Sequence, residues 1–126
     1  MDTNVLFSAL LFPNSKPAQA LLHILNEHDI VLCDQTIAEL WEVIGRKAPQ
    51  MLPDAEVFLA EISYELIPAV RYGVKLIRDA SDQPILNAAI VFNVDVILTG
   101  DKDFLSLGLE QPQCLTVSQF LTQEGY

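Results

Sequence analysis

The stretch of residues 94–105, VDVILTGDKDFL, places the strongest constraint on the fold. Its first five residues are apolar except for Asp95, and a glycine follows closely behind them. A short apolar run of this kind is typical of a strand buried in a parallel sheet. Asp101 and Asp103 come just after the strand, where open α/β sheets bind their ligands. An ordinary Asp-rich turn would give the same pattern, because Gly and Asp are both turn formers.

The composition fits one globular domain. The chain has 126 residues and about half of them are apolar, which allows a packed core and argues against disorder. No apolar run reaches the roughly 18 residues of a membrane span, and no basic region opens a signal peptide. We therefore expect one domain over residues 1–126 in the cytoplasm, without membrane association. Cys33 and Cys114 lie in apolar runs and are predicted to be buried hydrophobic residues in a reducing compartment.

The charge balance is strongly acidic, with 7 Lys and Arg against 17 Asp and Glu and a net charge of −10. This balance argues against non-specific binding to nucleic acid, which normally needs a basic surface. The excess negative charge has two explanations. It is solvated surface, which is the commoner case, or part of it gathers in a pocket that holds a divalent cation. In the second case the cation would let a phosphate group approach.

Short β-rich runs alternate with helical ones along the chain. The patterns predict helices over residues 18–28, 35–46, 54–66 and 85–93, and strands over 30–33, 96–98 and 114–117. Asp34 and Ser118 are the expected helix caps, and residues 67–77 are expected to be extended with a turn. The helix over 85–93 is apolar on nearly every side and should be well buried. The alternation predicts an α/β fold in which helices cover a parallel sheet.

Four carboxylates fall at positions that such a sheet would bring together: Asp2, Glu39, Asp82 and Asp101. The carboxyl ends of parallel strands share one edge, and the helices that follow them begin there. Four negative charges at one edge would repel each other strongly at an effective dielectric constant near 20. A divalent cation would relieve this repulsion, and ligation by oxygen atoms alone favours Mg²⁺ or Mn²⁺.

Each of these acids also has a structural explanation. A glutamate such as Glu39 usually lies on the solvated face of a helix, and its neighbour Glu42 is an equally good candidate for the acidic position. Asp82 is placed to cap a helix, and Asp79 competes for its role. Asp103 is placed to cap a short helix. The sequence alone leaves these alternatives open.

Four segments together carry a resemblance to a known family: DTNV at residues 2–5, IAEL at 37–40, RDASDQPIL at 78–86 and TGDKDF at 99–104. With these segments in this order, the chain resembles PIN-domain proteins of the VapC-like kind, the toxins of toxin–antitoxin pairs. The resemblance implies a three-layer α/β/α sandwich with a parallel sheet of about five strands. It also implies metal-dependent hydrolysis of RNA phosphodiester bonds.

The resemblance assigns roles to individual residues and partners. It implies a catalytic quartet of Asp2, Glu39, Asp82 and Asp101, metal ligation of Mg²⁺ or Mn²⁺ by Asp2, Asp82, Asp101 and Asp103, and positioning of water or substrate by Asn4 and Thr99. The expected partners are an RNA substrate, a small antitoxin protein and a second copy of the chain. His23 and His28 are interpreted as helix-face or cap residues rather than as catalysts.

The chain departs from the family at its beginning, because the family has a buried strand ahead of its first Asp and here only Met1 precedes Asp2. We expect a truncated first strand: it lies upstream, it is lost, or it begins later, around Val5. A missing central strand would leave backbone groups exposed, and pairing between chains along the vacated edge is one hypothesis. The alternative function is therefore a catalytically impaired PIN-like module that binds RNA or protein. A phosphatase-type domain is less favoured, because the chain lacks the second Asp of a D-x-D nucleophile motif.

Overall fold

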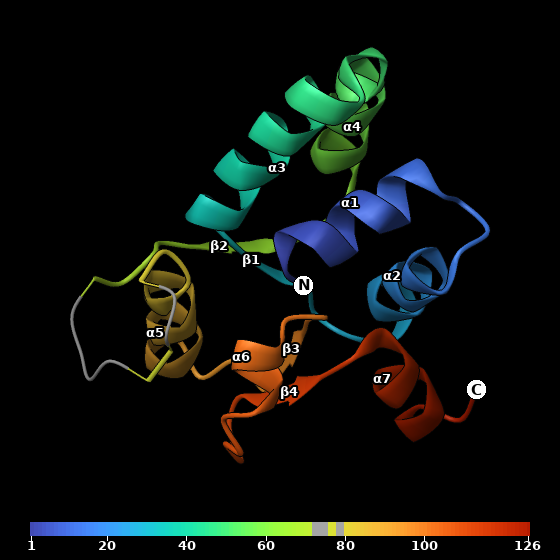
Figure 1. Ribbon diagram of the computed structural model, residues 1–126. Helices are drawn as coiled ribbons and strands as arrows, with labels where there is room; N and C mark the ends of the chain where they lie inside the picture. Colours follow the sequence, from blue (N-terminus) through green and yellow to red (C-terminus); the bar gives the residue numbers. More distant parts are fainter. Residues whose placement is uncertain (72–75, 78–79) are drawn as a thin grey trace.

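The computed structural model describes residues 1–71, 76–77 and 80–126, and it has an α/β fold in which helices alternate with short parallel strands (Figure 1). Among these residues, no helix is both long and apolar enough to cross a membrane. The helices are α1 (Thr3–Leu11), α2 (Lys16–Glu27), α3 (Asp34–Lys47), the short 3-10 helix η1 (Pro49–Met51), α4 (Leu52–Glu61), α5 (Gln83–Val91), α6 (Lys102–Leu105) and α7 (Val117–Gln123). The strands are β1 (Val31–Cys33), β2 (Glu65–Ile67), β3 (Val96–Leu98) and β4 (Gln113–Leu115).

The strands form two separate parallel pairs instead of one sheet. β1 pairs with β2, and β3 pairs with β4. The predicted parallel pairing is present, but the described residues contribute four strands in two pairs and not a sheet of about five. The chain's first residues contact the second pair, because the Asp2 N–H donates a 2.9 Å hydrogen bond to the carbonyl oxygen of Leu98 at the end of β3.

The first apolar segment is a helix, so the expectation of a strand beginning around Val5 is wrong. Asp2 is the N-cap of α1, and its Oδ1 accepts a 2.8 Å hydrogen bond from the Val5 N–H. Val5, Leu6 and Ala9 are buried, and this spacing is that of one helix face. The capping carboxylate and the helical spacing explain why this segment starts a helix directly after Asp2.

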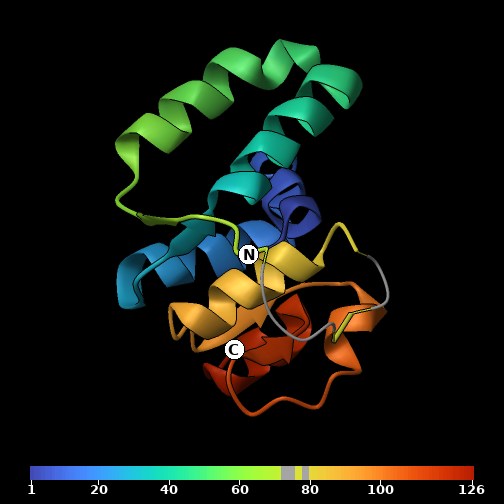
Figure 2. The same ribbon diagram turned by 90° about the vertical axis from the view of Figure 1, so that its left-hand side faces the viewer.

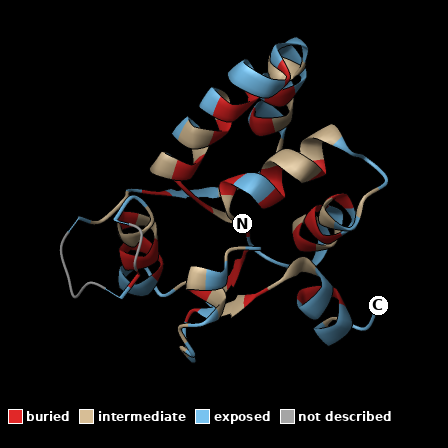
Figure 3. Ribbon diagram, in the orientation of Figure 1, coloured by how far each residue is buried: buried red, intermediate tan, exposed pale blue. Residues whose placement is uncertain are grey.

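Helices cover both faces of the strand pairs. Leu32 and Leu98 pack into a core cluster built with α1, α2, α3, α4 and α7. The next residue of β1, Cys33, and the preceding residue of β3, Ile97, lie in clusters that include residues of α5. Successive side chains of a strand point to opposite faces, so each pair is buried from two sides. Figure 3 shows the buried positions on the sides of the helices that face the strands.

The predicted helix over residues 54–66 extends too far. α4 ends at Glu61, where Ile62 takes an extended conformation (φ −79°, ψ 151°), and residues 65–67 form β2 instead. Pairing with β1 therefore outweighs the helical pattern of this stretch. α3 and α4 form a helical hairpin that projects from the strands, as both Figure 1 and Figure 2 show. Part of the segment expected to be extended, residues 72–75, lies outside the described residues.

The helix N-caps predicted at Asp34 and Ser118 are both wrong. The N-cap of α3 is Cys33, and the Asp34 carboxylate accepts a 2.9 Å hydrogen bond from the Ala69 N–H after β2. The Asp34 carboxylate therefore bonds to a residue distant in the sequence instead of capping the helix. The last helix is capped by Thr116, which forms a capping box with Gln119, because the helix begins one residue before Ser118.

The burial predicted for α5 holds on one side only. Leu86 and Ala88 are fully buried against the strand pairs. Ile90, Val91 and Phe92, at the end of the helix, are 40%, 56% and 43% exposed, so burial on nearly every side is wrong. An apolar pattern around the whole helix therefore does not show how far along the helix its packing neighbours extend.

Candidate functional site

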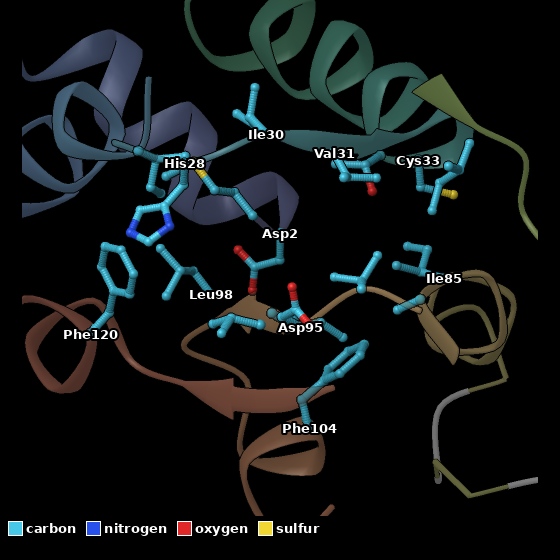
Figure 4. A pocket seen from close by; sticks show the side chains of 18 of the residues that line it. Asp2, His28, Ile30, Val31, Cys33, Ile85, Asp95, Leu98, Phe104 and Phe120 are labelled. Atoms are coloured by element: carbon cyan, nitrogen blue, oxygen red, sulfur yellow. The ribbon is translucent and has the colours of Figure 1, made fainter. Parts of the chain in front are cut away.

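A cavity of about 980 Å³ lies between the two strand pairs (Figure 4). Asp2, Glu39, Asp82 and Asp101 all line it. Three of these acids occupy the N-cap positions of α1, α5 and α6, and Glu39 lies in the second turn of α3. Four carboxylates that lie far apart in the sequence therefore face one space. Asn4, which is exposed, also lines the cavity.

Thr99 holds two of these acids in place. Its hydroxyl group is completely buried and donates a 2.5 Å hydrogen bond to Oδ2 of Asp2. The Thr99 hydroxyl oxygen also accepts a 3.0 Å hydrogen bond from the Asp101 N–H. Because Oδ1 of Asp2 also accepts the α1 cap bond, both oxygens of that carboxylate have fixed positions. Thr99 therefore orients both Asp2 and the backbone at Asp101.

Asp101 and Asp103 are joined by the first turn of α6. Oδ1 of Asp101 accepts a 2.8 Å hydrogen bond from the Asp103 N–H, which makes Asp101 the cap of this short helix. Asp103 is half-buried and is not among the described residues that line the cavity. The two carboxylates thus belong to the same first turn of α6, and Asp101 is the one that lines the cavity.

Glu39 is held by α1 and by its own helix. Its Oε2 accepts a 3.2 Å hydrogen bond from the Thr3 hydroxyl, and its Oε1 accepts a 3.1 Å hydrogen bond from Nε2 of Gln35. Gln35 Nε2 also donates to the Ser81 carbonyl oxygen at 2.6 Å, directly before Asp82. This network joins α1 and α3 to the start of α5 and fixes Glu39 at the cavity.

The structure separates Glu39 from its competing candidate, Glu42. Glu42 is not among the described residues that line the cavity, its side chain is 67% exposed, and its Oε1 lies 3.4 Å from Nε of Arg46 one turn along α3. Of this pair, Glu39 is the residue that lines the cavity. Asp82 lines it too, whereas its competitor Asp79 lies outside the described residues.

Sequence reasoning missed Gln35. It lies four residues before Glu39, and this helical spacing was the available signal that the two side chains meet. Its Oε1 is buried and has no hydrogen-bond partner among the described residues. An unsatisfied buried acceptor beside a carboxylate is costly on its own, which indicates that a donor or a cation belongs near it.

A family model for the PIN domain matches residues 1–103. The chain belongs to the PIN-domain family. The match spans all four acids of the cavity as well as Asn4, Thr99 and Asp103. No curated protein and no solved structure matches the chain. PIN domains are generally nucleases that use divalent metal ions, so membership indicates a nuclease-type function.

The donor set of this PIN domain fits a divalent cation. The cavity offers the carboxylates of Asp2, Glu39, Asp82 and Asp101, and oxygen ligands alone suit Mg²⁺ or Mn²⁺. The buried amide oxygen of Gln35, which has no hydrogen-bond partner among the described residues, belongs to the side chain that bonds to Glu39. The acids are spread around the cavity. Among the described residues, the one set of three His, Cys, Asp or Glu side chains with all ligand atoms within 4.8 Å is His23, His28 and Glu124. Mg²⁺ usually keeps several waters and binds through one or two carboxylates, which is compatible with this spread.

The two histidines of α2 and its C-cap have a structural role, and His28 also lines the cavity. His28 is the C-cap of α2, as predicted, and His23 lies on the same helix. Nε2 of His23 lies 2.9 Å from Oε1 of Glu124, Nε2 of His28 contacts the same oxygen, and Nδ1 of His23 lies 3.0 Å from the Tyr126 hydroxyl. The hydrogen bonds from His28 and then His23 lower the pKa of the Glu124 carboxyl. This cluster ties the C-terminal residues to α2.

Proposed function

We propose that this PIN domain is a metal-dependent endoribonuclease that hydrolyses RNA phosphodiester bonds. The observation that carries the proposal is the shared cavity, which Asp2, Glu39, Asp82 and Asp101 all line. Membership of a nuclease family supports the reaction type. The choice of RNA as substrate comes from the resemblance of the four sequence segments to VapC-like toxins.

In this proposal Asp2, Asp82 and Asp101 hold Mg²⁺ or Mn²⁺, with Asp103 as an additional ligand. The ion, when bound, supplies an activated water and neutralises charge on the scissile phosphate. Glu39 completes the acidic quartet. Hydrogen bonds fix the carboxylates of Asp2, Glu39 and Asp101, which reduces the reorganisation needed when a cation binds.

The remaining polar residues position the acids and the substrate. Thr99 is a positioning residue, because its hydroxyl group fixes Asp2 and the backbone at Asp101. Asn4 is exposed at the cavity, where its amide suits contact with RNA or water. The net charge of −10 repels a polyanion, so the cation is needed for phosphate binding as well as for chemistry.

The proposal treats residues 1–126 as one domain. Two contacts beyond the matched residues 1–103 support this: β4 pairs with β3, and α7 packs against α2. We also propose that the protein acts in the cytoplasm as the toxin of a toxin–antitoxin pair, with a small antitoxin as its inhibitor. A second copy of the chain is a further proposed partner.

The test is cleavage of end-labelled RNA in the presence of Mg²⁺ or Mn²⁺, comparing the parent chain with Asp101→Asn. Asn caps helices as well as Asp does, so the variant keeps α6 while losing one negative charge. We expect cleavage to fall by about a hundredfold or more, because even outer-shell partners of metal ligands contribute about 10–100-fold. Undiminished cleavage and undiminished Mn²⁺ binding in Asp101→Asn would show that the site is wrongly assigned.

The alternative is a catalytically impaired PIN module that binds RNA or protein without cutting. Two observations favour it: the strands form two pairs, and the acids are not gathered within 4.8 Å of one another. A titration with Mn²⁺ separates the alternatives. The alternative predicts RNA binding without cleavage and no rise in melting temperature with Mn²⁺.

A further inference from the structure

Both histidines of the chain meet one carboxylate at the place where α7 ends beside α2 (Figure 1). Nε2 of His23 lies 2.9 Å from Oε1 of Glu124, and Nε2 of His28 contacts the same oxygen. One ligand atom from each of these residues lies within 4.8 Å of the other two. Two imidazole nitrogens and a carboxylate oxygen therefore converge in this His–Glu cluster, which includes none of the four acids of the proposed nuclease site.

The end of α7 holds Glu124 and Tyr126 in place. Glu124 is the C-cap of the helix, and Gly125 follows it at φ +96°. The Gly125 N–H donates to the Thr122 carbonyl oxygen at 3.2 Å, and the Tyr126 N–H donates to the Leu121 carbonyl oxygen at 2.9 Å. This pair of bonds is the Schellman motif, whose left-handed residue after the cap is usually glycine. The backbone therefore fixes the position of Glu124 without help from the histidines.

The Tyr126 hydroxyl gives His23 the outer partner that a metal-binding imidazole needs. It lies 3.0 Å from Nδ1 of His23, and the two ring centroids are 5.1 Å apart. When the Nδ1–H donates to this hydroxyl oxygen, the lone pair of the ring is on Nε2, the nitrogen that faces Glu124. Histidines that bind metals almost always donate their other ring N–H to an oxygen, which fixes the tautomer and the orientation of the ring.

The His–Glu cluster is shielded on one side and open on the other. The side chains of His23 and Glu124 are 14% and 23% exposed, whereas that of His28 is 44% exposed. The ring of Phe120 lies against both imidazoles, with centroid distances of 6.0 Å to His23 and 5.9 Å to His28, and Figure 4 shows it next to His28. The exposed side at His28 leaves a path for an ion and room for a water ligand.

We propose that His23, His28 and Glu124 form a second metal site, which binds Zn²⁺ through two imidazole nitrogens and one carboxylate oxygen with water as the fourth ligand. Two histidines, one carboxylate and a water are a known donor set of zinc sites with an open position. Ligand atoms about 2.0–2.1 Å from a tetrahedral Zn²⁺ lie about 3.3 Å from one another. The 2.9 Å between His23 Nε2 and Glu124 Oε1 is close to this separation, and the exposed His28 has room to adjust.

The donor atoms set this site apart from the acidic quartet. Imidazole nitrogen suits Zn²⁺ and its neighbours among the transition metals, whereas Mg²⁺ and Mn²⁺ are suited by carboxylate and water oxygen. Zn²⁺ in the His–Glu cluster joins the end of α7 to α2, segments 101 positions apart in the chain at His23 and Glu124. Because the ion binds the folded chain, it stabilises that chain. This role is structural and is independent of RNA cleavage.

The test measures Zn²⁺ binding to the full chain by calorimetry and by the imidazole NMR signals, at about pH 7.5 so that most of the imidazole is neutral. The chain has two histidines and both lie in the cluster, so every imidazole signal reports on the proposed site. We expect one Zn²⁺ per chain, a shift of the ring signals of both histidines, and a higher melting temperature. An excess of Mg²⁺ is expected to leave the imidazole signals unchanged.

Variants separate ligation from attraction by charge. We expect His28→Gln and Glu124→Gln each to weaken Zn²⁺ binding by about a hundredfold or more, and Tyr126→Phe, which keeps the ring and loses the hydroxyl, to weaken it by about tenfold. The matched control is Glu27→Gln, because Glu27 is next to His28 in the chain but is not one of the three clustered residues. Its effect is expected to be about twofold or less. Asp82→Asn is expected to leave the shifts of the imidazole signals unchanged.

Several results would overturn the proposal. Absence of Zn²⁺ binding, or binding that leaves the imidazole signals unchanged, would show that the histidines hold no ion. Equal losses in Glu27→Gln and Glu124→Gln would show that negative charge in general attracts Zn²⁺. One Zn²⁺ for every two chains would make the histidines a contact between copies instead of a site within one chain. Absence of RNA cleavage would contradict the proposed function alone, because none of these measurements depends on it.

Discussion

Thr99 Oγ1 lies 2.5 Å from Asp2 Oδ2 and joins residues that are 97 positions apart in the chain. The hydroxyl group is completely buried, and its oxygen also accepts a hydrogen bond from the Asp101 N–H. One small side chain therefore connects the end of β3 to the N-terminus of α1 and to the cap of α6. The proposed metal ligands on either side of it depend on this bond for their relative position.

Replacing Thr99 with Val keeps the shape of the side chain and removes the hydroxyl group. We expect the free energy of unfolding to fall by about 1–3 kcal/mol, because the Asp2 carboxylate and the Asp101 N–H lose a buried partner. Urea denaturation measures the change. Thr99→Ser keeps the hydroxyl and loses one methyl group, at a cost of about 1 kcal/mol. If the Val variant is as stable as the parent chain, the hydrogen bond contributes nothing.

The two glutamates of α3 give a matched pair for the cleavage assay. Glu39 lines the cavity and accepts two hydrogen bonds, whereas Glu42 is exposed beside Arg46. We expect Glu39→Gln to lower RNA cleavage by about 10–100-fold and Glu42→Gln to leave it unchanged. Both changes are isosteric and remove one charge from the same helix. Equal effects of the two variants would show that the loss is a general charge effect rather than a property of the cavity.

The meeting of the four acids around one space was more predictable from sequence than the arrangement of the strands. Asp82 and Asp101 occupy N-cap positions. In the sequence, Asp82 is marked by the helical segment that follows it, and Asp101 is marked by the short apolar run that precedes it. Their gathering follows from parallel topology, which places helix starts at one edge. Glu39 was separable from Glu42 only by tertiary contact with Thr3, which no local pattern encodes. The family resemblance is what linked the distant segments.

The sequence-based prediction of the fold is wrong where tertiary contacts outweigh the local preference of a segment. Residues 5–11 are apolar enough for a strand, but the Asp2 cap and the burial of one helix face stabilise the helix α1 instead. Residues 65–67 continue a helical pattern, yet they pair with β1. Asp34 is a good capping residue whose carboxylate instead bonds to Ala69. In each case a partner distant in sequence supplies a contact that periodicity cannot reveal.

Divalent cations should stabilise the folded chain. Ligand that binds only the folded state at 100 times its Kd stabilises by about 2.7 kcal/mol. For a chain of this length, that corresponds to a rise in melting temperature on the order of 10 °C. We expect this rise with Mn²⁺ or Mg²⁺, its reversal by EDTA, and its loss in Asp82→Asn. A rise of equal size in that variant would place the bound ion elsewhere, and the His23, His28 and Glu124 cluster would be the next candidate.

The Glu124 cluster predicts how stability changes in acid. Hydrogen bonds from His28 and then His23 lower the pKa of Glu124 below its ordinary value of 4.5. A carboxyl group with a lowered pKa in the folded state stabilises that state fully above its unfolded pKa. This stabilisation is lost as the pH falls below 4.5 and through the folded pKa. We expect the difference in melting temperature between the parent chain and Glu124→Gln to be present near pH 6 and to shrink as the pH falls below 4.5.

The matched control is Glu56→Gln, on the exposed side of α4, because none of the described hydrogen bonds and ion pairs involves Glu56. We expect its melting temperature to follow that of the parent chain throughout the acid range. His28→Gln removes the larger of the two hydrogen-bond contributions to the Glu124 pKa, and it should reproduce much of the effect of Glu124→Gln. If the difference between the parent and Glu124→Gln instead grew as the pH fell, the sign of the linkage would be reversed. The carboxyl group would then favour its protonated form in the folded chain, and the two histidines would not be its donors.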